Sequence, residues 1–369
     1  MSSLSHVTTT ILARSLAAVI VLAASATGSL GQEPATTPLA PPAHAPLVYA
    51  PLVYAGGMGP GAGKHVVLVA GDEEYRSEEA LPQLARILSV QHGFRCTVLF
   101  SIDPATGAID PDKRESIPGL EALDTADLLV LFTRFRRLPD ADMKHVVDYV
   151  ERGKPILGIR TATHAFAYEA DSKSPYASWS WDSKAWPGGF GKQVLGETWV
   201  SHHGKHGTES TRGIVPDAVR SLPILNGVVD VWGKTDVYGI GALPSDATVI
   251  LEGSILESLD PAAKAVADPR NAPRMPIAWI RLRTLDSGPK KGSVQRIACS
   301  PIGASIDLPS RDLRRLFVNL AYWCTGLESQ IAAEPKADLV GTFEPTMFGF
   351  GAFRRGMKPS DFAMPTPAK

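Results

Sequence analysis

A ten-residue segment near the middle of the chain constrains the fold more than any other. Residues 155–164 read Pro-Ile-Leu-Gly-Ile-Arg-Thr-Ala-Thr-His, an apolar run followed by small and polar residues. This pattern predicts a buried strand, a sharp turn and then a helix. Gly158 and Ala162 lie two residues before and after Arg160. That is the spacing of a nucleophile elbow, because a strained turn has no room for larger neighbours. Arg160 stands where a Ser or Cys nucleophile would be, which excludes acyl transfer through a covalent ester or thioester there.

Strands and helices alternate on the N-terminal side of this elbow. Apolar runs predict strands over 65–70, 94–100, 127–133 and 156–159, and helical spacing predicts helices over 78–92 and 140–152. The strands are continuously apolar, which is typical of a parallel sheet covered on both faces. Because crossovers between parallel strands are right-handed, we predict an α/β fold with a doubly wound parallel sheet.

The composition changes after the elbow. Residues 165–245 are rich in Gly, Trp, His and Ser and lack periodicity, which predicts a long Trp/His-rich insertion over the sheet. Regular elements are expected again at 248–251, 276–282 and 294–299, followed by an amphipathic helix over 313–324. We therefore predict one α/β domain over 64–330 and an irregular C-terminal tail over 331–369 that wraps the surface.

The N-terminus predicts export. Arg14 precedes an apolar run over 16–24, and small residues follow as far as Gly31, which is typical of a secretory signal over 1–31. The run is short for a bilayer span, although an uncleaved anchor is the alternative. Residues 32–63 are rich in Pro, Ala and Gly and are expected to form a linker. We expect a periplasmic or extracellular protein with no membrane segment after cleavage.

Charge and cysteine content exclude some classes of protein. The chain has 37 basic and 38 acidic residues. Such a balanced overall charge does not indicate a protein that binds nucleic acid. Its three cysteines, Cys96, Cys299 and Cys324, lie in apolar patterns and form no CxxC pair. Their odd number argues against a disulfide framework, and we expect three buried hydrophobic residues.

Three polar segments should meet where the parallel strands end, because ligands of open α/β sheets bind beyond that edge. They are the loop after the first strand, the elbow and a histidine-rich stretch of the insertion. They supply the candidate catalytic residues Asp72, Glu73, Glu74, Arg160, His164, His202, His203 and His206. Imidazole and carboxylate groups suit general acid–base catalysis. Alternatively, the histidines only hold the insertion in place, or bind a metal ion; we predict no metal and no cofactor.

Arg160 and the tryptophans each allow two interpretations. A guanidinium at a helix N-terminus favours an anion or a developing oxyanion; the alternative is a structural ion pair with a carboxylate of residues 72–74. Either way, we expect Arg160 to lie beside an acidic side chain and near the histidines.

Four tryptophans crowd residues 179–199, and their flat faces suit a sugar ring, although they could instead form the core of the insertion.

Over residues 65–327 the chain resembles the trehalose-utilisation (ThuA-like) proteins, a branch of the class I glutamine amidotransferase-like superfamily. The matching segments are 71–75, 158–164, 195–197, 202–204, 232–238, 302–305 and 314–323. The resemblance implies a flavodoxin-like α/β domain and a link to carbohydrate metabolism, and it is closest to exported members. Arg160 stands where amidotransferases carry Cys, so glutaminase activity is not carried over.

We therefore expect an exported protein that acts on a small-molecule carbohydrate, either a sugar or an oxidised sugar, by acid–base chemistry. The expected substrate-binding residues are Tyr75, Thr161, Thr163, Trp199, Trp232, Asp236 and Tyr238. A non-catalytic carbohydrate-binding or accessory protein is one alternative, and a metal-dependent hydrolase is another. Whether the protein is an enzyme, and its oligomeric state, stay open at the level of the sequence.

Overall fold

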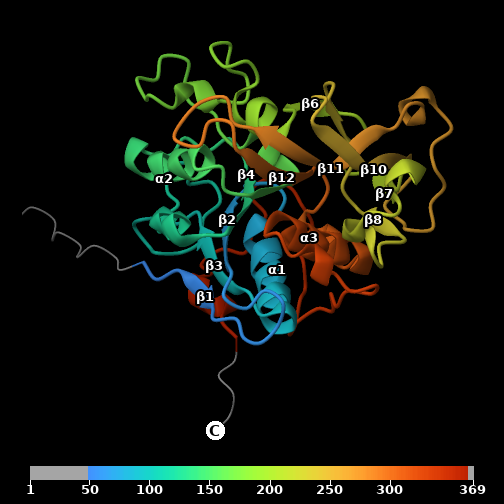
Figure 1. Cartoon of the computed structure of the whole chain (residues 1–369), viewed down its shortest axis with the longest axis horizontal. Helices are drawn as coiled ribbons and strands as arrows, with labels where there is room; N and C mark the ends of the chain where they lie inside the picture. The colour runs from blue at the N-terminus through green and yellow to red at the C-terminus, as the bar shows by residue number, and fades with distance from the viewer. Residues whose placement is uncertain (1–48, 365–369) are drawn as a thin grey trace, which may run out of the picture. The chain divides into compact units, whose positions relative to one another are not determined.

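The computed structural model describes residues 49–364 (Figure 1). The predicted signal over 1–31 lies outside the described residues. The α-helices are α1 (Ser77–His92), α2 (Asp140–Glu151) and α3 (Arg311–Cys324). The strands are β1 (Leu52–Tyr54), β2 (His65–Gly71), β3 (Arg95–Phe100), β4 (Leu128–Thr133), β5 (Ile156–Ile159), β6 (Trp199–His202), β7 (Ser210–Ile214), β8 (Val231–Gly233), β9 (Tyr238–Ile240), β10 (Ala247–Leu256), β11 (Met275–Thr284) and β12 (Val294–Ser300).

A parallel block forms the centre of the fold. Strands β3, β2, β4, β5 and β12 pair in parallel in that order. Both faces of the block are buried: Val66 and Leu68 of β2 pack in the core cluster that contains α1 and α3, whereas Val67 and Val69 pack in the cluster that contains α2. Burial on both faces explains why these strands are continuously apolar. The predicted α/β class and the first four strands are confirmed.

The sheet as a whole is mixed, which corrects the prediction of a wholly parallel one. Its order is β1-β3-β2-β4-β5-β12-β11-β10-β7-β8. Strands β11, β10, β7 and β8 extend one edge in antiparallel pairing, and β1 pairs antiparallel with β3 at the other. In Figure 1 the yellow and orange strands lie at the opposite end of the sheet from β1. Antiparallel neighbours need no helical crossover, so a helix–strand alternation could not reveal them.

Two segments expected to be irregular contribute strands. The insertion over 165–245 holds β6 to β9, of which β7 and β8 join the main sheet while β6 and β9 pair with each other. The predicted linker over 32–63 holds β1, whose Leu52 and Tyr54 side chains are buried. Strands of three to five residues are too short to produce a period that sequence reasoning can recognise.

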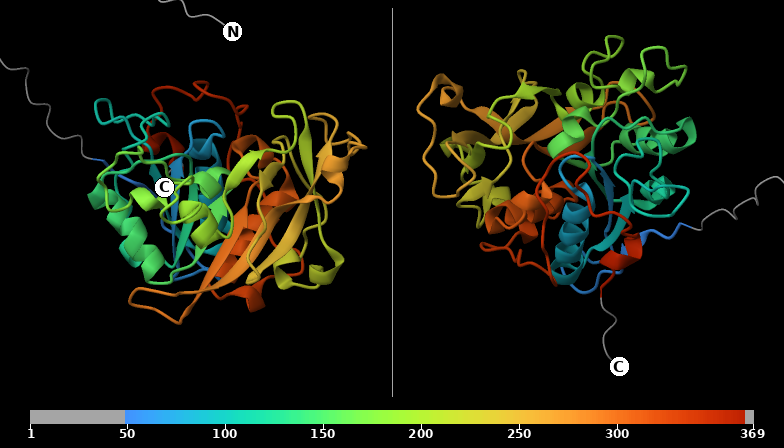
Figure 2. Two further views of the ribbon diagram at one scale, coloured as in Figure 1. Left: turned by 90° about the horizontal axis from the view of Figure 1, so that it is seen from above. Right: turned by 180° about the vertical axis from the view of Figure 1, so that it is seen from behind.

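The C-terminal tail has one short 3-10 helix at Pro359–Phe362 and is otherwise irregular up to residue 364. It is nevertheless held to the domain, because Tyr54 Oη donates to the Phe362 carbonyl at 2.6 Å. The two views of Figure 2 show this red segment crossing the side of the domain that carries α1. The three cysteines are buried and free, as expected. Among the described residues, no helix has the length and apolar character that a membrane crossing requires.

Candidate functional site

The elbow after β5 has the predicted backbone. Arg160 directly follows the strand with φ 46°, a left-handed conformation that is unusual for a residue with a side chain. A Cβ atom on Gly158 would lie 2.9 Å from Leu195 Cδ1 and 3.1 Å from Ala162 Cβ, which explains the small residues. The helix expected after the turn is only the 3-10 helix Arg160–His164.

Backbone strain gathers at this edge of the sheet. Within residues 49–364, the three non-glycine residues with positive φ are Arg76, Phe135 and Arg160. They follow β2, β4 and β5, the parallel strands whose carboxyl ends meet here. Strained backbone persists only where the surroundings enforce it, and it clusters at functional sites. The strain therefore marks the same edge that the strand topology selects.

Arg160 is fully buried beneath this edge. Its Nη2 lies 3.1 Å from Asp236 Oδ1, and its Nη1 donates to the carbonyls of Asp236 at 2.8 Å and Pro301 at 2.7 Å. The guanidinium carbon lies 4.3 Å from the ring centroid of Tyr75 and 3.8 Å from that of Tyr238. The predicted acidic partner is therefore present, but it is Asp236 rather than a carboxylate of residues 72–74.

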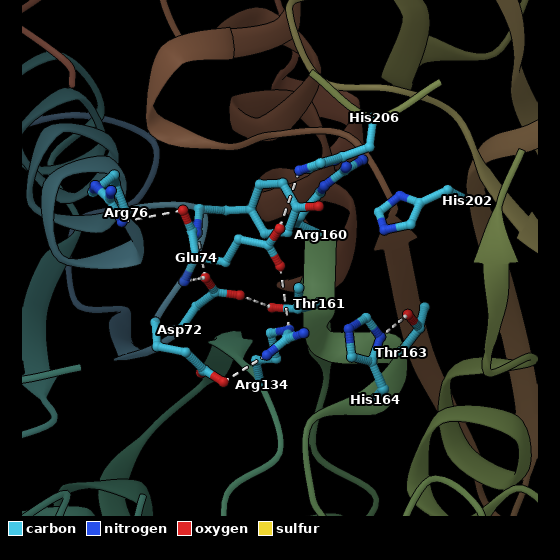
Figure 3. A network of polar contacts seen from close by, with 12 residues as sticks. Asp72, Glu74, Arg76, Arg134, Arg160, Thr161, Thr163, His164, His202 and His206 are labelled. Atoms are coloured by element: carbon cyan, nitrogen blue, oxygen red, sulfur yellow. Dashed lines mark hydrogen bonds and ion pairs between the residues drawn. The ribbon is translucent and has the colours of Figure 1, made fainter. Parts of the chain in front are cut away.

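Asp236 also joins two histidines of the insertion. His202 Nδ1 lies 2.7 Å from Asp236 Oδ2, and His206 Nδ1 lies 3.1 Å from Oδ1. His206 Nε2 is 3.3 Å from Glu74 Oε1 (Figure 3). Burial alone would raise the pKa of Asp236, but hydrogen bonds from the two histidines and the charge of Arg160 lower it below its ordinary value. We call Glu74, His202, His206 and Asp236 the histidine–carboxylate cluster.

The exposure of this cluster suits chemistry on a ligand. The side chains of His202 and His206 are 37% and 35% exposed, whereas that of Asp236 is fully buried. A buried carboxylate that contacts two partly exposed imidazoles fixes their orientation at the surface of the site. The arrangement can accept and return a proton at the surface of the site.

Glu73 is not brought to the histidines. Its Oε1 accepts from Arg134 at 2.6 Å and from Arg114 at 3.1 Å, and its Oε2 accepts from Arg136 at 2.7 Å. Both oxygens are thus engaged by guanidinium groups beneath the loop. These contacts tie the loop to the segment that follows β4, and the catalytic role predicted for Glu73 stays a prediction.

Asp72 holds the loop and the elbow together. Its Oδ1 accepts from the backbone N–H of Glu74 at 2.7 Å and from that of Tyr75, and its Oδ2 accepts from Thr161 Oγ1 at 2.5 Å (Figure 3). Burial, followed by the nearby charge of Glu73, raises the pKa of Asp72 to about 6. Among the three predicted loop carboxylates, Glu74 is the one that reaches a histidine.

His164 lies against an aromatic wall, by which we mean Phe135, Trp181 and Trp199. Its ring centroid is 5.0 Å from that of Phe135 and 5.3 Å from that of Trp199, and Trp181 lies 5.7 Å from both. Burial and the charges of Arg134 and Arg160 lower the pKa of His164 well below its ordinary value. Thr163 Oγ1 lies 3.1 Å from His164 Nδ1, which fixes the orientation of the ring beside the wall.

Trp179 and Trp186 pack in the core cluster that also contains α2. Trp179 stacks on Phe190 at 5.7 Å and lies 5.4 Å from Trp186. Trp179 and Trp186 thus pack within the domain, whereas Trp181 and Trp199 belong to the aromatic wall. Contact of these rings with a sugar stays a prediction.

Two candidates lie away from the histidine–carboxylate cluster. His203 Nε2 lies 2.7 Å from the carbonyl of Arg270, which ties it to a neighbouring loop. Trp232, on the edge strand β8, donates its indole N–H to Ser210 Oγ at 3.2 Å. Successive residues of a strand point to opposite faces, so His202 and His203 separate as β6 ends.

The C-terminal tail supplies a contact that sequence reasoning missed. The Phe348 ring lies 4.9 Å from that of His206 and 5.6 Å from that of Tyr75. Its neighbour Gly349 donates its N–H to the Glu74 carbonyl at 2.8 Å and accepts from Arg76 Nη2 at 2.6 Å. The tail has no periodic pattern, so nothing in its residues indicated that it would reach the site.

Comparison with known proteins gives structural likenesses only. No family model and no curated protein matches the sequence. The chain is similar to a ThuA-like protein from Bacteroides uniformis, with 12% identity, a TM-score of 0.45 and coverage of 77% of this chain and 100% of that one. It is also similar to a ThuA-like protein from Parabacteroides merdae, with 13% identity, a TM-score of 0.44 and coverage of 82% and 99%.

A cytoplasmic protein from Salmonella typhimurium is a further likeness, with 14% identity, a TM-score of 0.35 and coverage of 70% of this chain and 98% of that one. All three TM-scores are below 0.5, so the function is inferred from the side chains of the site and not from these likenesses.

Proposed function

We propose that this chain is an exported ThuA-like protein that binds a sugar or an oxidised sugar and converts it by acid–base chemistry. The observation that carries the proposal is the sharing of one buried carboxylate, Asp236, by His202, His206 and Arg160. In this arrangement a half-exposed histidine exchanges a proton with the substrate, and Glu74 stabilises the charge that His206 gains. The absence of a nucleophile at Arg160 argues against glutaminase activity.

The surroundings of the cluster support a carbohydrate substrate. The aromatic wall offers flat apolar faces, and the indole N–H of Trp199 is buried without a partner among residues 49–364. Sugar recognition combines such faces with hydrogen bonds to hydroxyl groups. The order of the five parallel strands, with the first strand between the second and third, supports a flavodoxin-like arrangement, in which ligands bind beyond the carboxyl ends of the strands.

The test is turnover of a panel of disaccharides and keto-sugars by the purified protein and its variants. We expect His202→Ala and His206→Ala to lower kcat by at least a hundredfold, which is in the range of a lost acid–base group. His203→Ala is the matched control, since the adjacent histidine points to Arg270, and it should keep activity. Near-UV circular dichroism confirms that each variant is folded.

Two results would contradict the proposal. One is the absence of turnover across the whole panel. The other is sugar binding, measured by calorimetry, that persists in the double variant His202→Ala/His206→Ala without any product in mass spectrometry. The second result would instead support a non-catalytic carbohydrate-binding protein.

A further inference from the structure

His206 is in an unusual position between two carboxylates. Its Nε2 faces Glu74 Oε1 at 3.3 Å, and its Nδ1 faces Asp236 Oδ1 at 3.1 Å. A neutral imidazole carries one proton, so it can donate to only one of these oxygens. The other nitrogen would then present a lone pair to a carboxylate, which is repulsive. A positive species must therefore lie on one side: either a second proton or a metal ion.

The contact with Glu74 favours the metal ion on the Asp236 side. Histidines that bind metals commonly donate their other N–H to a carboxylate, which fixes the tautomer. Glu74 Oε1 lies 3.3 Å from His206 Nε2, which is within reach of such a contact, and the Glu74 side chain is only 6% exposed. The Nδ1 lone pair of His206 is thereby directed to the space that His202 Nδ1 and Asp236 also face.

We propose that His202 Nδ1, His206 Nδ1 and a carboxylate oxygen of Asp236 bind one divalent transition-metal ion. These ligand atoms all lie within 4.8 Å of one another. His202 Nδ1 is 2.7 Å from Asp236 Oδ2, and His206 Nδ1 is 3.1 Å from Asp236 Oδ1. Ligand atoms about 2.1 Å from one ion lie roughly 3 Å apart in tetrahedral or octahedral coordination. Two imidazoles and one carboxylate, with positions left open for water or substrate, suit Zn²⁺ or Fe²⁺.

The charges around the cluster agree with this assignment. Asp236 and Glu74 carry two negative charges, and Arg160 contributes one positive charge through Asp236 Oδ1. Among the described contacts, Arg160 donates to Asp236 Oδ1, whereas Asp236 Oδ2 contacts His202. Oδ2 is therefore the better metal ligand. The half-exposed histidines leave a path by which an ion can enter.

This inference deepens the proposed function and rests on the same cluster. His202 and His206 would hold the ion through their Nδ1 atoms, and the ion would supply the base by lowering the pKa of a bound water molecule. The histidines would then act as ligands, and the proton exchange assigned to them above would pass to that water. Glu74 then becomes a positioning residue that acts through His206.

The experiment measures Zn²⁺ binding to the full chain, purified without a histidine tag. Metal content is measured by mass spectrometry, and the affinity for Zn²⁺ alone by chelator competition. We expect one ion per chain and a thermal midpoint that rises with Zn²⁺. His202→Ala and His206→Ala should each weaken binding by at least tenfold, and Glu74→Gln by about ten- to a hundredfold. His203→Ala, the matched control, should bind as the wild type does.

Failure to bind Zn²⁺, or equal binding by His202→Ala and His206→Ala, would overturn the metal site. The outcomes also separate the two proposals. Sugar turnover that is unchanged by a chelator would support direct acid–base chemistry by the histidines and contradict the bound ion. Stoichiometric, cluster-dependent Zn²⁺ binding without any sugar turnover keeps the metal site and overturns the proposed function.

Discussion

At the residue scale, Arg160 connects the fold to the site. It is forced into a left-handed backbone conformation at the end of β5 and buries its charge against Asp236, between the rings of Tyr75 and Tyr238. Asp236 in turn orients His202 and His206. A single guanidinium therefore supports the carboxylate on which both proposals depend.

Replacing Arg160 should cost much stability. Arg160→Met leaves the buried carboxylate of Asp236 without its buried guanidinium partner, and removing one member of a buried ion pair typically costs about 3–5 kcal/mol. Denaturant unfolding measures the loss. Arg137→Met is the control: its partners Glu115 and Glu169 are exposed, and surface pairs contribute at most about 1 kcal/mol. Equal losses for both variants would contradict the importance of the buried pair.

Glu78 predicts a pH dependence of stability. Both its carboxylate oxygens are buried without partners within residues 49–364, and burial raises its pKa to about 8. The folded protein thus keeps a proton that the unfolded chain releases. The free energy of unfolding should therefore fall as the pH rises from about 4.5 to about 8, by roughly 4 kcal/mol for a shift of this size.

Glu78→Gln removes this titration. The difference in unfolding free energy between the variant and the wild type should grow in favour of the variant as the pH rises through that window. Denaturant unfolding at pH 5, 6, 7 and 8 tests the prediction, with Glu151→Gln on the exposed end of α2 as the control. A difference that stays constant with pH would show that the burial of Glu78 has no such effect.

At the scale of elements, the site is assembled from segments that lie far apart in the chain. The loop after β2, the elbow after β5 and the turns around β6 and β9 converge, and the C-terminal tail covers them through Phe348. Glu79 of α1 anchors this tail by accepting from Thr346 N at 2.8 Å and from its Oγ1 at 2.8 Å. We therefore expect the tail to restrict the access of reagents larger than an ion to the partly exposed His206.

Removing the Phe348 ring should expose His206. Phe348→Ala takes away the ring that lies 4.9 Å from that imidazole, so modification of His206 by diethylpyrocarbonate in the presence of a chelator should become at least twofold faster. Peptide mass spectrometry measures the rate. Met347→Ala, at the adjacent exposed position, should leave the rate unchanged. An unaltered rate in Phe348→Ala would mean that the tail does not restrict this site.

At the scale of the whole molecule, one sheet joins two kinds of architecture. The parallel block and its antiparallel extension meet at the pairing of β12 with β11, and a single core cluster contains residues from both. The ion pair between Arg160 and Asp236 joins the two parts, because Arg160 follows β5 and Asp236 lies between β8 and β9. We therefore expect the two parts to unfold together.

Two probes test this expectation. The seven tryptophans all lie at or after residue 179, so their fluorescence reports on the part after the elbow. Far-UV circular dichroism is sensitive to α1 and α2 in the part before it. Coincident midpoints in denaturant are expected for a single cooperative unit. Separate transitions would show that the antiparallel extension is an independent domain.

The amino-acid sequence by itself determined the parallel block and the elbow. Continuous apolar runs between helical patterns revealed β2 to β5, and Gly158 and Ala162 around Arg160 revealed the strained turn, because these features depend on neighbours along the chain. The same reasoning selected Glu74, Arg160, His202 and His206 as candidates, since strand topology specifies the edge where loops meet. Their chemical roles stay predictions.

Only the tertiary structure decided which of these side chains touch. Glu73 meets a set of arginines and Glu74 meets His206, although the two are adjacent in the chain. Asp236 rather than the loop carboxylates pairs with Arg160, and His203 points away from the cluster that His202 joins. The antiparallel strands and the position of Phe348 were likewise not predictable. Such contacts depend on long-range packing between short, irregular segments, and no local period or propensity specifies that packing.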